Sequence, residues 1–335
     1  MAEHIVRIEA PARLHFGMLD LRGSLGRRFG GIGAGVFDPS LVVEIERAPA
    51  VEAEGAEADR AAAFARRYLE SQGIRGGARI AIRHAIPEHA GLGSGTQLAL
   101  AVARGIAELY DRPTSAGALA AAVGRGRRSA IGTWLFESGG FIVEGGRRED
   151  EERIAPLLVR LPIPDLWRCV VAVPWTAEGV SGESELQAFR ELPPPPLREV
   201  EHVAHLVLMS LLPALVEGDL AVFGETITTI QQINGSWFAP AQGGTFASGP
   251  STELISKMRE HGAAAGVGQS SWGPAVYAIT EGDDRAAELA SSAGEVLNGS
   301  GMVYVNQFAR TGARVTSFER QTPRPTAVNT SPGLR

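Results

Sequence analysis

The chain has 335 residues, of which 44% are hydrophobic, so it is long enough to bury one large core or two of ordinary size. Its formal net charge of −6 gives no long-range attraction for nucleic acid or for an anionic membrane surface. We therefore expect neither as a partner. Of the 32 basic residues, Lys257 is a lysine and the other 31 are arginines. Any phosphate that side-chain cations bind must therefore be bound almost entirely by guanidinium groups.

The single cysteine, Cys169, excludes a disulfide within the chain and a cysteine-based metal site. The N-terminus carries no apolar segment of the signal-peptide type, and we expect no apolar stretch of the ~18 residues that span a bilayer. The cytoplasm is the expected compartment. The 41 glycines and the 6% aromatic content favour a polar site built from backbone groups over an aromatic-lined groove.

In the first half of the chain, three segments alternate apolar and polar residues, which predicts half-buried strands. They are His4–Glu9, Leu41–Arg47 and Arg79–Ala85. Helix-forming residues predict a helix over Ala56–Ser71. A second helix is expected over Ser94–Tyr110, because apolar residues recur along one face and Pro113 ends the pattern.

In the second half, Trp167–Pro174 reads as a strand, and the proline run at 193–196 interrupts regular structure. Further helices and strands are then expected in this order: helices Glu199–Glu217, Asp219–Gln231 and Thr252–His261, strand Val276–Thr280, helix Asp283–Ser291 and strand Met302–Phe308. This order favours a ferredoxin-like second half. We predict an α+β protein with one domain over residues 1–165, a second over 166–320 and a loose tail over 321–335.

A glycine-rich stretch leads directly into the helix expected at Ser94. Gly91, Gly93 and Gly95 let backbone N–H groups approach an anion, Ser94 and Thr96 add hydroxyl donors, and the helix N-terminus adds partial positive charge. This pattern predicts a phosphate-binding loop, although it lacks the lysine of a Walker A motif. The alternative is a tight turn in which Ser94 only caps the helix.

A second polar stretch, Gly124–Ser129, places three arginines between glycines. Guanidinium forks suit bidentate contacts with phosphate, so we interpret Arg125, Arg127, Arg128 and Ser129 as anion-binding residues. The alternative is a solvated basic turn, since the pair Arg147-Arg148 shows that adjacent arginines also occur elsewhere.

Three motifs in order resemble those of the GHMP-kinase superfamily: Pro11-Ala12-Arg13-Leu14, the loop from Pro87 to Ser94, and Ala265–Pro274. The resemblance implies two domains, a ribosomal-S5-like N-terminal domain and a ferredoxin-like C-terminal domain. Two departures argue against a kinase. Gly95 stands where kinases carry a second serine that helps to hold Mg²⁺, and Ser129–Gly132 lacks the acid that activates the attacking hydroxyl.

Within that superfamily, the pattern resembles the β-ribofuranosylaminobenzene 5′-phosphate synthases. The matching stretches are Ala10–Gly17, Gly124–Gly132, Gln242–Gly244 and Gly268–Pro274. The resemblance implies a decarboxylating pentosyltransferase of tetrahydromethanopterin biosynthesis. Such an enzyme transfers the phosphoribosyl group of phosphoribosyl pyrophosphate to a ring carbon of 4-aminobenzoate or 4-hydroxybenzoate, and CO₂ and pyrophosphate leave. The sequence does not decide between the two benzoates.

The resemblance also implies site residues. Arg13, His15 and Asp20 are expected to be catalytic. Besides the residues of the glycine and arginine loops, the substrates are expected to contact Gln242, Gln269, Ser270, Ser271 and Trp272. His15 could instead be a structural histidine, Trp272 a core residue and Gln242 part of a turn.

Mg²⁺ is the expected cofactor, since the departing pyrophosphate must be neutralised. Asp20, Glu137 and Glu144 are unranked candidates for the accompanying carboxylates, and the metal ligands stay unassigned. The expected partners are the two small-molecule substrates, and a homodimer stays open. Two other functions remain as alternatives: an ATP-dependent small-molecule kinase of the same superfamily, and a non-catalytic protein that binds a phosphorylated metabolite.

Overall fold

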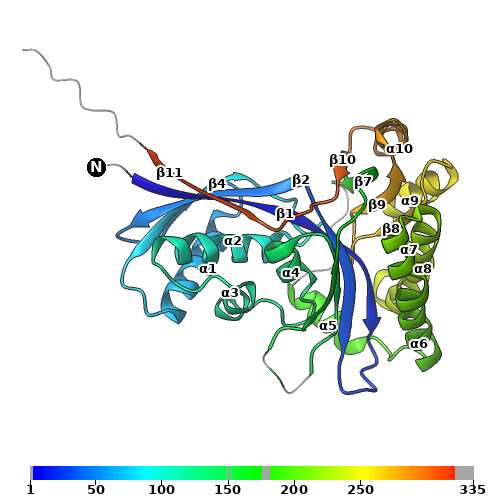
Figure 1. Cartoon of the computed structure of the whole chain (residues 1–335), viewed down its shortest axis with the longest axis horizontal. Coiled ribbons are helices and arrows are strands. Elements are labelled where there is room, and N and C mark those ends of the chain that lie inside the picture. Colours follow the sequence, from blue (N-terminus) through cyan, green and yellow to red (C-terminus); the bar gives the residue numbers. More distant parts are fainter. Residues whose placement is uncertain (1–2, 149–150, 152, 176–181, 321–335) are drawn as a thin grey trace, which may run out of the picture.

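The computed structural model describes residues 3–148, 151, 153–175 and 182–320, and Figure 1 shows its two sheets with helices packed against them. The described strands are β1 (Glu3–Asp20), β2 (Phe29–Ala48), β3 (Glu52–Glu54), β4 (Gly77–His84), β5 (Phe141–Glu144), β6 (Leu157–Leu161), β7 (Trp167–Pro174), β8 (Gly266–Gln269), β9 (Val276–Glu281), β10 (Gly301–Gln307) and β11 (Arg314–Arg320). The described helices are α1 (Ala58–Ser71), α2 (Ser94–Leu109), α3 (Ala116–Val123), α4 (Ile131–Ser138), α5 (Gly182–Glu191), α6 (Leu197–Leu206), the π-helical turn η1 (Val207–Leu211), α7 (Leu212–Glu217), α8 (Leu220–Gln242), α9 (Pro250–Glu260) and α10 (Asp283–Leu297). The predicted tail, 321–335, lies outside the described residues.

The first sheet is built around β1 and β2, which pair antiparallel along most of their length. The strand order is β11-β1-β2-β4-β3, and β5 pairs with both β2 and β6. The register of β1 shifts between Pro11 and Ala12 and again between His15 and Gly17. Such irregularities re-aim side chains, and here they flank Arg13 and His15.

The strand predicted over His4–Glu9 continues to Asp20, so its predicted end is wrong. Alternating residues of the continuation, from Ala10 to Phe16, are fully buried in the core. His15, on the opposite face, is only 3% exposed because the second half of the chain covers it. The polar face is therefore not a solvent face, and periodicity alone does not reveal this part of the strand.

Helices α1 to α4 cover one face of the first sheet (Figure 1). The stripe that predicted α2, namely Leu98, Val102 and Ile106, is buried in the core as expected. Helix α2 is buried on nearly all sides, because it also packs against α1, α3 and α4. The phosphate-loop candidate is therefore attached to the most enclosed helix of this half.

The second sheet has the order β10-β7-β9-β8, and all its neighbouring strands are antiparallel. Val170 and Ala172 of β7 pack with residues of α9 and α10, whereas Cys169 and Val171 join the main core. That main core also holds the first sheet, and the ring centroids of Phe16 and Tyr277 lie 4.9 Å apart. The two sheets are thus joined by shared packing.

The last described strand, β11, does not belong to the second sheet. It pairs antiparallel with β1, from Glu9↔Arg314 to Glu3↔Arg320. β11 thus lies in the first sheet, although its residues fall within the range 166–320 predicted for the second domain. Its residues alternate weakly and are mostly exposed, so the sequence pattern gave no strand here. The second sheet itself begins at Trp167, close to the predicted boundary at 165.

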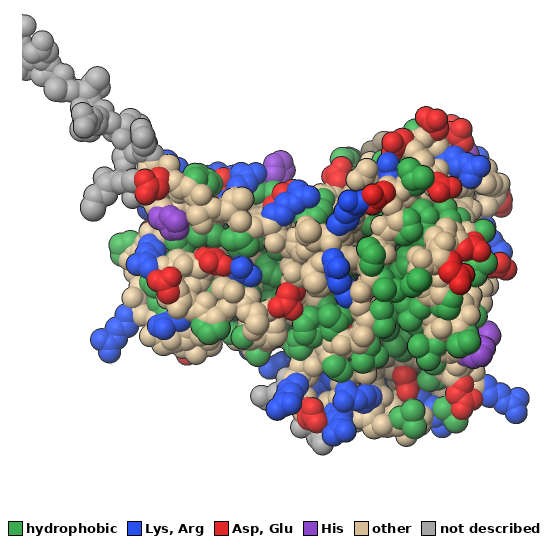
Figure 2. All heavy atoms as spheres, in the orientation of Figure 1, with side chains coloured by type: hydrophobic (Ala, Val, Ile, Leu, Met, Phe, Trp, Pro, Cys, Tyr) green, Lys and Arg blue, Asp and Glu red, His purple; other side chains and the backbone are tan. Residues whose placement is uncertain are grey.

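The helical run Leu197–Glu217 has the length and a mean hydropathy, 1.4, that would suit a bilayer span. This corrects the expectation that the chain holds no such apolar stretch. The run is interrupted by η1, and Val203 and Leu211 are fully buried in the main core against α8. Other residues of the run, Leu208 and Met209, are exposed, and Figure 2 shows hydrophobic side chains gathered over α7 and α8. We interpret the run as a core helix with an apolar outer edge.

The backbones of α8 and β8 lie close together at Gly224. A Cβ at this position would overlap the backbone of Ala265, and the backbone of Gly266 approaches from the same side. Since backbone cannot move aside as a side chain can, we expect Gly224→Ala to lower the free energy of unfolding by about 1–3 kcal/mol in urea titrations. The control is Gly294→Ala in α10, where nothing lies within 4 Å of the new methyl group. Equal stability of the two variants would contradict the prediction.

Candidate active site

The glycine-rich loop connects β4 to the N-terminus of α2. Gly91 and Gly93 have φ of 77° and 76°, in the left-handed region that favours glycine, and Gly93 is the N-cap of α2. A side chain on Gly91 would overlap the carbonyl oxygen of Ser270, so that position must also be bare. The loop therefore presents its backbone and the helix N-terminus to the space beside it, as an anion site requires.

Strand β1 is fixed to this loop through Arg13. The Arg13 backbone N–H donates to the carbonyl of Leu92 at 2.8 Å, and its Nη2 donates to the carbonyl of Gly91 at 2.9 Å. These bonds hold the guanidinium group beside the loop.

The turn after β8 meets both of these elements. The Ser270 hydroxyl donates to the carbonyl of Gly91 at 2.7 Å and accepts the backbone N–H of His15 at 3.0 Å. The backbone N–H of Ala275 donates to the carbonyl of Ala90 at 3.1 Å. The glycine loop and the Gly268–Trp272 stretch, both expected to contact the substrates, therefore lie side by side. Ser270, predicted to contact substrate, is occupied in joining the three segments.

A cavity of about 390 Å³ opens over the loop, and we call it the arginine cavity. Its lining consists of Arg13, Arg60, His89, Gly91, Leu92, Gly93, Ser94, Gly95, Thr96, Arg125, Arg128, Ser271 and Trp272. Every residue predicted in the glycine loop is present. Four arginines and a helix N-terminus face one space, and this combination suits a multiply charged anion.

The structure separates the arginines of the predicted anion-binding run. Arg125 and Arg128 line the arginine cavity, whereas Arg127 is exposed and does not line it. Its backbone carbonyl accepts a hydrogen bond from Arg147 at 2.7 Å. The turn geometry that directs Arg128 inward directs the preceding side chain outward, so the alternative of a solvated residue fits Arg127.

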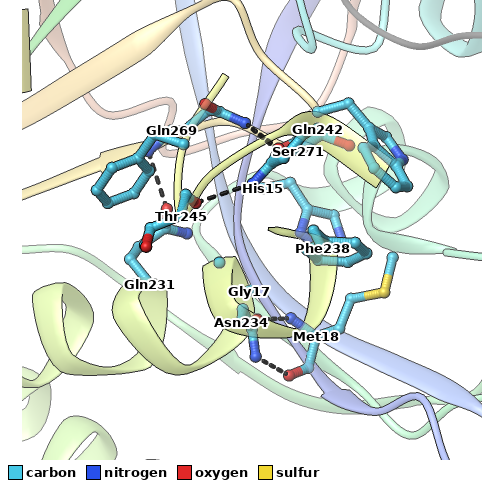
Figure 3. Close-up of a pocket in the computed structure, with 13 residues that line it drawn as sticks. His15, Gly17, Met18, Gln231, Asn234, Phe238, Gln242, Thr245, Gln269 and Ser271 are labelled. Atoms are coloured by element: carbon cyan, nitrogen blue, oxygen red, sulfur yellow. Dashed lines mark hydrogen bonds between the residues drawn. The ribbon is translucent and has the colours of Figure 1, made fainter. Parts of the chain in front are cut away.

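A second, narrower cavity of about 30 Å³ adjoins the first, and we call it the glutamine pocket (Figure 3). It is lined by His15, Gly17, Met18, Gln231, Asn234, Gly235, Phe238, Gln242, Thr245, Phe246, Gln269, Ser271 and Trp272. Ser271 and Trp272 line both cavities, so the two cavities adjoin at this turn. The Asn234 side chain bonds to the backbone N–H and carbonyl of Met18, which fixes α8 against β1 (Figure 3).

The predicted glutamines belong to one hydrogen-bonded chain in this pocket. Gln269 Nε2 donates to Gln242 Oε1 at 3.3 Å and to the carbonyl of Ser271 at 3.0 Å, while its Oε1 accepts the N–H of Ala247 at 2.7 Å. Gln242 Nε2 in turn donates to the carbonyl of Thr245. These bonds shape the turn that carries Ser271. Gln242 is the last residue of α8, and Gly243 closes that helix with φ of 80°.

Trp272 is only 4% exposed, yet its remaining surface reaches both cavities. Its ring centroid lies 4.7 Å from that of Phe238 and 5.4 Å from that of Phe189. Both readings of Trp272 therefore apply, since it is a core residue whose edge forms a cavity wall.

The surroundings of His15 favour its neutral imidazole form. Burial lowers its pKa to about 3, and the nearby Arg13 charge acts in the same direction. Its Nε2 lies 3.4 Å from the hydroxyl of Ser129, a predicted anion-binding residue that lines neither cavity. Ser129 also favours the charged form of Glu144, which is fully buried. Ser129 thus lies near both a cavity-lining histidine and a buried acid.

Glu144 keeps a carboxyl group beneath the site. Burial raises its pKa to about 7, although the N–H groups of Gly146, at 2.8 Å, and of Ala130, at 3.3 Å, favour the charged form. Glu144 touches neither cavity, so it is no ligand for a metal in the arginine cavity.

The remaining acids predicted from the sequence have structural roles. Asp20 Oδ1 accepts the N–H groups of Arg22 and Gly23 at 2.6 and 2.8 Å and so closes the turn after β1, away from both cavities. Glu137 accepts the N–H of Ala116 at the start of α3. Among the residues that the structure describes, no group of three His, Cys, Asp or Glu side chains is arranged to hold a metal. The described lining of the arginine cavity contains no carboxylate.

Sequence reasoning missed several residues of the site. Arg60 and His89 line the arginine cavity, while Gln231, Asn234 and Phe238 line the glutamine pocket. The residues of α8 carried a signal, because polar Gln231 and Asn234 recur at helical spacing on a face that is otherwise apolar. Arg60 carried none, since it reaches the loop only through the packing of α1 against α2.

Comparison with known proteins decides the family. The chain is 36% identical to the beta-ribofuranosylphenol 5′-phosphate synthase of Methanothermobacter thermautotrophicus over 327 residues, which covers 91% of this chain and 97% of the relative. The synthase of the same name from Archaeoglobus fulgidus is 35% identical over 290 residues, covering 83% of this chain and 88% of the relative. This chain belongs to the beta-ribofuranosylphenol 5′-phosphate synthase family. The family predicted from the motifs is confirmed, and the chain is an enzyme.

The fold of this synthase is that of the GHMP kinases, as predicted. The model of the GHMP kinases N terminal domain matches residues 58–134, and that of the GHMP kinases C terminal domain matches residues 211–299. Homoserine kinase from Cytophaga hutchinsonii is similar with a TM-score of 0.63 at 17% identity, covering 93% of this chain and 97% of the kinase. Galactokinase from Lactococcus lactis has a TM-score of 0.64 at 13% identity, covering 92% and 95%. At such identities the likeness shows the fold alone.

The pKa of His15 predicts how the stability of this synthase depends on pH. The folded-state pKa, about 3, lies below the unfolded value of 6.5, so the folded chain binds fewer protons between these limits. Stability contributed by neutral His15 is therefore complete above pH 6.5 and lost as pH falls toward 3, by at most ~1.4 kcal/mol per pH unit. The variant His15→Gln lacks this loss. We expect the difference in unfolding free energy between wild type and variant to shrink from pH 7 to pH 4.5 in urea titrations. Parallel pH curves would show that His15 is protonated in the folded state.

Proposed function

We propose that this synthase transfers the phosphoribosyl group of phosphoribosyl pyrophosphate to the carboxylate-bearing ring carbon of 4-hydroxybenzoate, releasing CO₂ and pyrophosphate. The observation that carries the proposal is a cavity with four arginines and a helix N-terminus beside an aromatic wall, in a chain of this family. The printed names of the relatives contain a phenol, which favours the hydroxyl-bearing acceptor over 4-aminobenzoate. The proposed place of the reaction is methanopterin-type cofactor synthesis.

The donor suits the arginine cavity. Phosphoribosyl pyrophosphate carries three phosphate groups, and the lining offers four guanidinium groups together with the loop N–H groups. A volume of about 390 Å³ is in the range of small-molecule sites. Both the 5′-phosphate and the pyrophosphate can therefore be bound in one cavity.

The acceptor ring suits the end of this cavity where Trp272 and Ser271 form the wall. An aromatic edge packs well against a planar ring, and Ser271 adds a hydroxyl at the same place. The glutamine pocket adjoins this wall, and His15 is part of its lining. Neutral His15 can donate or accept a hydrogen bond there without adding charge.

The bonds and electrons of the proposed reaction balance without an activated hydroxyl. The ring carbon that bears the carboxylate attacks C1 of the ribose, and the C1–O bond breaks with its electron pair going to pyrophosphate. The C–CO₂ bond then breaks, and its electron pair restores the aromatic ring. No base has to deprotonate an attacking alcohol, which agrees with the absence of an acid from the cavity lining. A kinase of this superfamily would need a carboxylate, or another base, to accept the proton of the attacking hydroxyl.

Three further expectations stay predictions: Mg²⁺ as cofactor, the cytoplasm as compartment and a homodimer as the assembly. Since the described residues offer no cluster that fits a protein-held ion, any Mg²⁺ would have to enter with the phosphates of the donor. The family membership sets aside the alternative of a protein that only binds a metabolite.

The stoichiometry of products tests the proposal. With phosphoribosyl pyrophosphate and carboxyl-labelled 4-hydroxybenzoate, in the presence of Mg²⁺ and the absence of ATP, we expect CO₂, pyrophosphate and C-riboside in equal molar amounts. The parallel reaction with 4-aminobenzoate shows which acceptor the site prefers, as kcat/KM. Turnover that requires ATP, or a riboside that keeps its carboxylate, would overturn the assignment.

Arg128 and Arg127 provide a matched pair of substitutions. Arg128 lines the arginine cavity and should make a charge-assisted contact with a phosphate, so Arg128→Ala should lower kcat/KM for phosphoribosyl pyrophosphate by about ten- to a hundredfold. Arg127→Ala removes an exposed guanidinium from the same turn and should change this value by less than about threefold. The reverse order of effects would show that the turn binds substrate in another conformation.

A further inference from the structure

Arg60 lies in the first turn of α1, outside every motif that the sequence revealed. Its guanidinium group forms ion pairs with Glu57 and, at 3.2 Å, with Glu88, which precedes the glycine loop. Its side chain keeps 37% of its surface exposed and lines the arginine cavity. The two carboxylates thus hold Arg60 at the rim of the cavity, opposite the start of α2.

Arg60 and Arg125 meet over Gly95. A Cβ built on Gly95 would overlap Nη2 of Arg60 and would lie 3.2 Å from Nη2 of Arg125. Gly95 is not among the residues with positive φ, so its backbone conformation does not require glycine. A methyl group at this position would instead displace the guanidinium group of Arg60 from its place over the loop.

Among the described residues, Arg125, unlike Arg60, is not held by an ion pair. Arg125 packs over the ring of Phe64 at 4.9 Å, and no carboxylate in the described part of the chain forms an ion pair with it. Burial and the like charges of Arg60, Arg128 and Arg67 lower the pKa of Arg125 to about 10. Neighbouring cations raise one another's energy, and a bound anion relieves this repulsion.

The charges of this arrangement favour an anion over a metal cation. Glu57 and Glu88, the acids beside the loop, are already paired with Arg60. The remaining side chains over Gly95 are cationic, and a divalent cation would be repelled by them. The groups present fit a phosphate oxygen at the position where the loop would otherwise accept a metal.

We propose that Arg60 and Arg125 form a clamp over Gly95 that binds the pyrophosphate of the donor directly and takes up its charge as it leaves. The proposal rests on the phosphoribosyl transfer proposed above. Pyrophosphate carries more charge than the 5′-phosphate, and it gains further charge when the C1–O bond breaks. The densest cluster of cations, beside the N-terminus of α2, therefore suits the leaving group. No proton is transferred in this step.

Binding of inorganic pyrophosphate to the whole chain tests the clamp without turnover. The binding of each probe is measured by titration calorimetry, in a buffer that contains EDTA to remove metal ions. Ribose 5-phosphate is the second probe. We expect Arg60→Ala and Gly95→Ala each to weaken pyrophosphate binding by about ten- to a hundredfold. Binding of ribose 5-phosphate should change by less than about threefold, since it is expected to use the other arginines.

Gly95→Ala complements Arg60→Ala, because it removes no charge and places alanine in a helix, where alanine is favoured over glycine by ~1 kcal/mol. Since the new methyl group also stands in the way of the loop N–H groups, loss of pyrophosphate binding supports the clamp only where Arg60→Ala loses binding too. The matched control for the glycine is Gly294→Ala, and that for the arginine is Arg66→Ala, an exposed residue of α1. Arg60→Lys keeps the charge without the fork and should retain only part of the affinity.

Pyrophosphate affinity that is unchanged in both Arg60→Ala and Gly95→Ala would overturn the clamp, as would binding that requires Mg²⁺ and ignores both substitutions. These outcomes are separate from the failure of the proposed function. If the wild-type enzyme makes the C-riboside and the substitutions leave pyrophosphate binding unchanged, the proposed function stands and the clamp is rejected. If the wild-type enzyme makes no C-riboside but binds pyrophosphate through Arg60, the clamp stands and the proposed acceptor chemistry is rejected.

Discussion

The hydroxyl group of Ser270 holds the site together. It donates to the carbonyl of Gly91 and accepts the N–H of His15, so one side chain from the second half joins the glycine loop and strand β1 of the first. The residue is fully buried, and its bonds replace backbone partners that loop and strand would otherwise lack. The contact also brings Trp272 to the edge of the arginine cavity. The chemistry therefore depends on the two sheets sharing one junction.

Around this junction the protein gathers arginine side chains on one cavity. The chain as a whole is acidic, at −6, yet Arg13, Arg125 and Arg128 face one cavity. Holding like charges together costs free energy in the absence of an anion. That cost is met by packing: Arg125 lies over Phe64 and Arg128 over Phe189, at 4.9 and 5.8 Å. Flat guanidinium groups tolerate such aromatic faces, which lysine would not do as well. The preference for arginine thus has a use here besides any bias in composition.

The sequence predicted those parts of the site that lie in contiguous motifs. The glycine loop, Arg13, His15 and the turn at Ser271-Trp272 come together as expected, because backbone geometry dictates their local shape. It could not predict partners brought by tertiary packing, such as Arg60, nor the second half of β1, whose polar face is buried. The sequence also could not show which of Arg127 and Arg128 faces the cavity, because the conformation of the turn decides which of two adjacent side chains points inward. The edge strand β11 was missed because exposed strands carry weak alternation.

Kinases that are 12–22% identical to this chain share its fold, and a fold does not fix the chemistry of a site. In this chain the site beside the glycine loop is cationic. A glycine at position 95 opens the space beside the helix N-terminus, and Arg60, held by Glu57 and Glu88, fills that space with positive charge. A loop that could share a metal with a nucleotide then favours an anion bound by the protein alone. Because the attacking group in the proposed reaction is an electron-rich ring, no base is needed opposite this charge. Strong charge neutralisation at the leaving group is sufficient, and the acids of the region are free to position arginines.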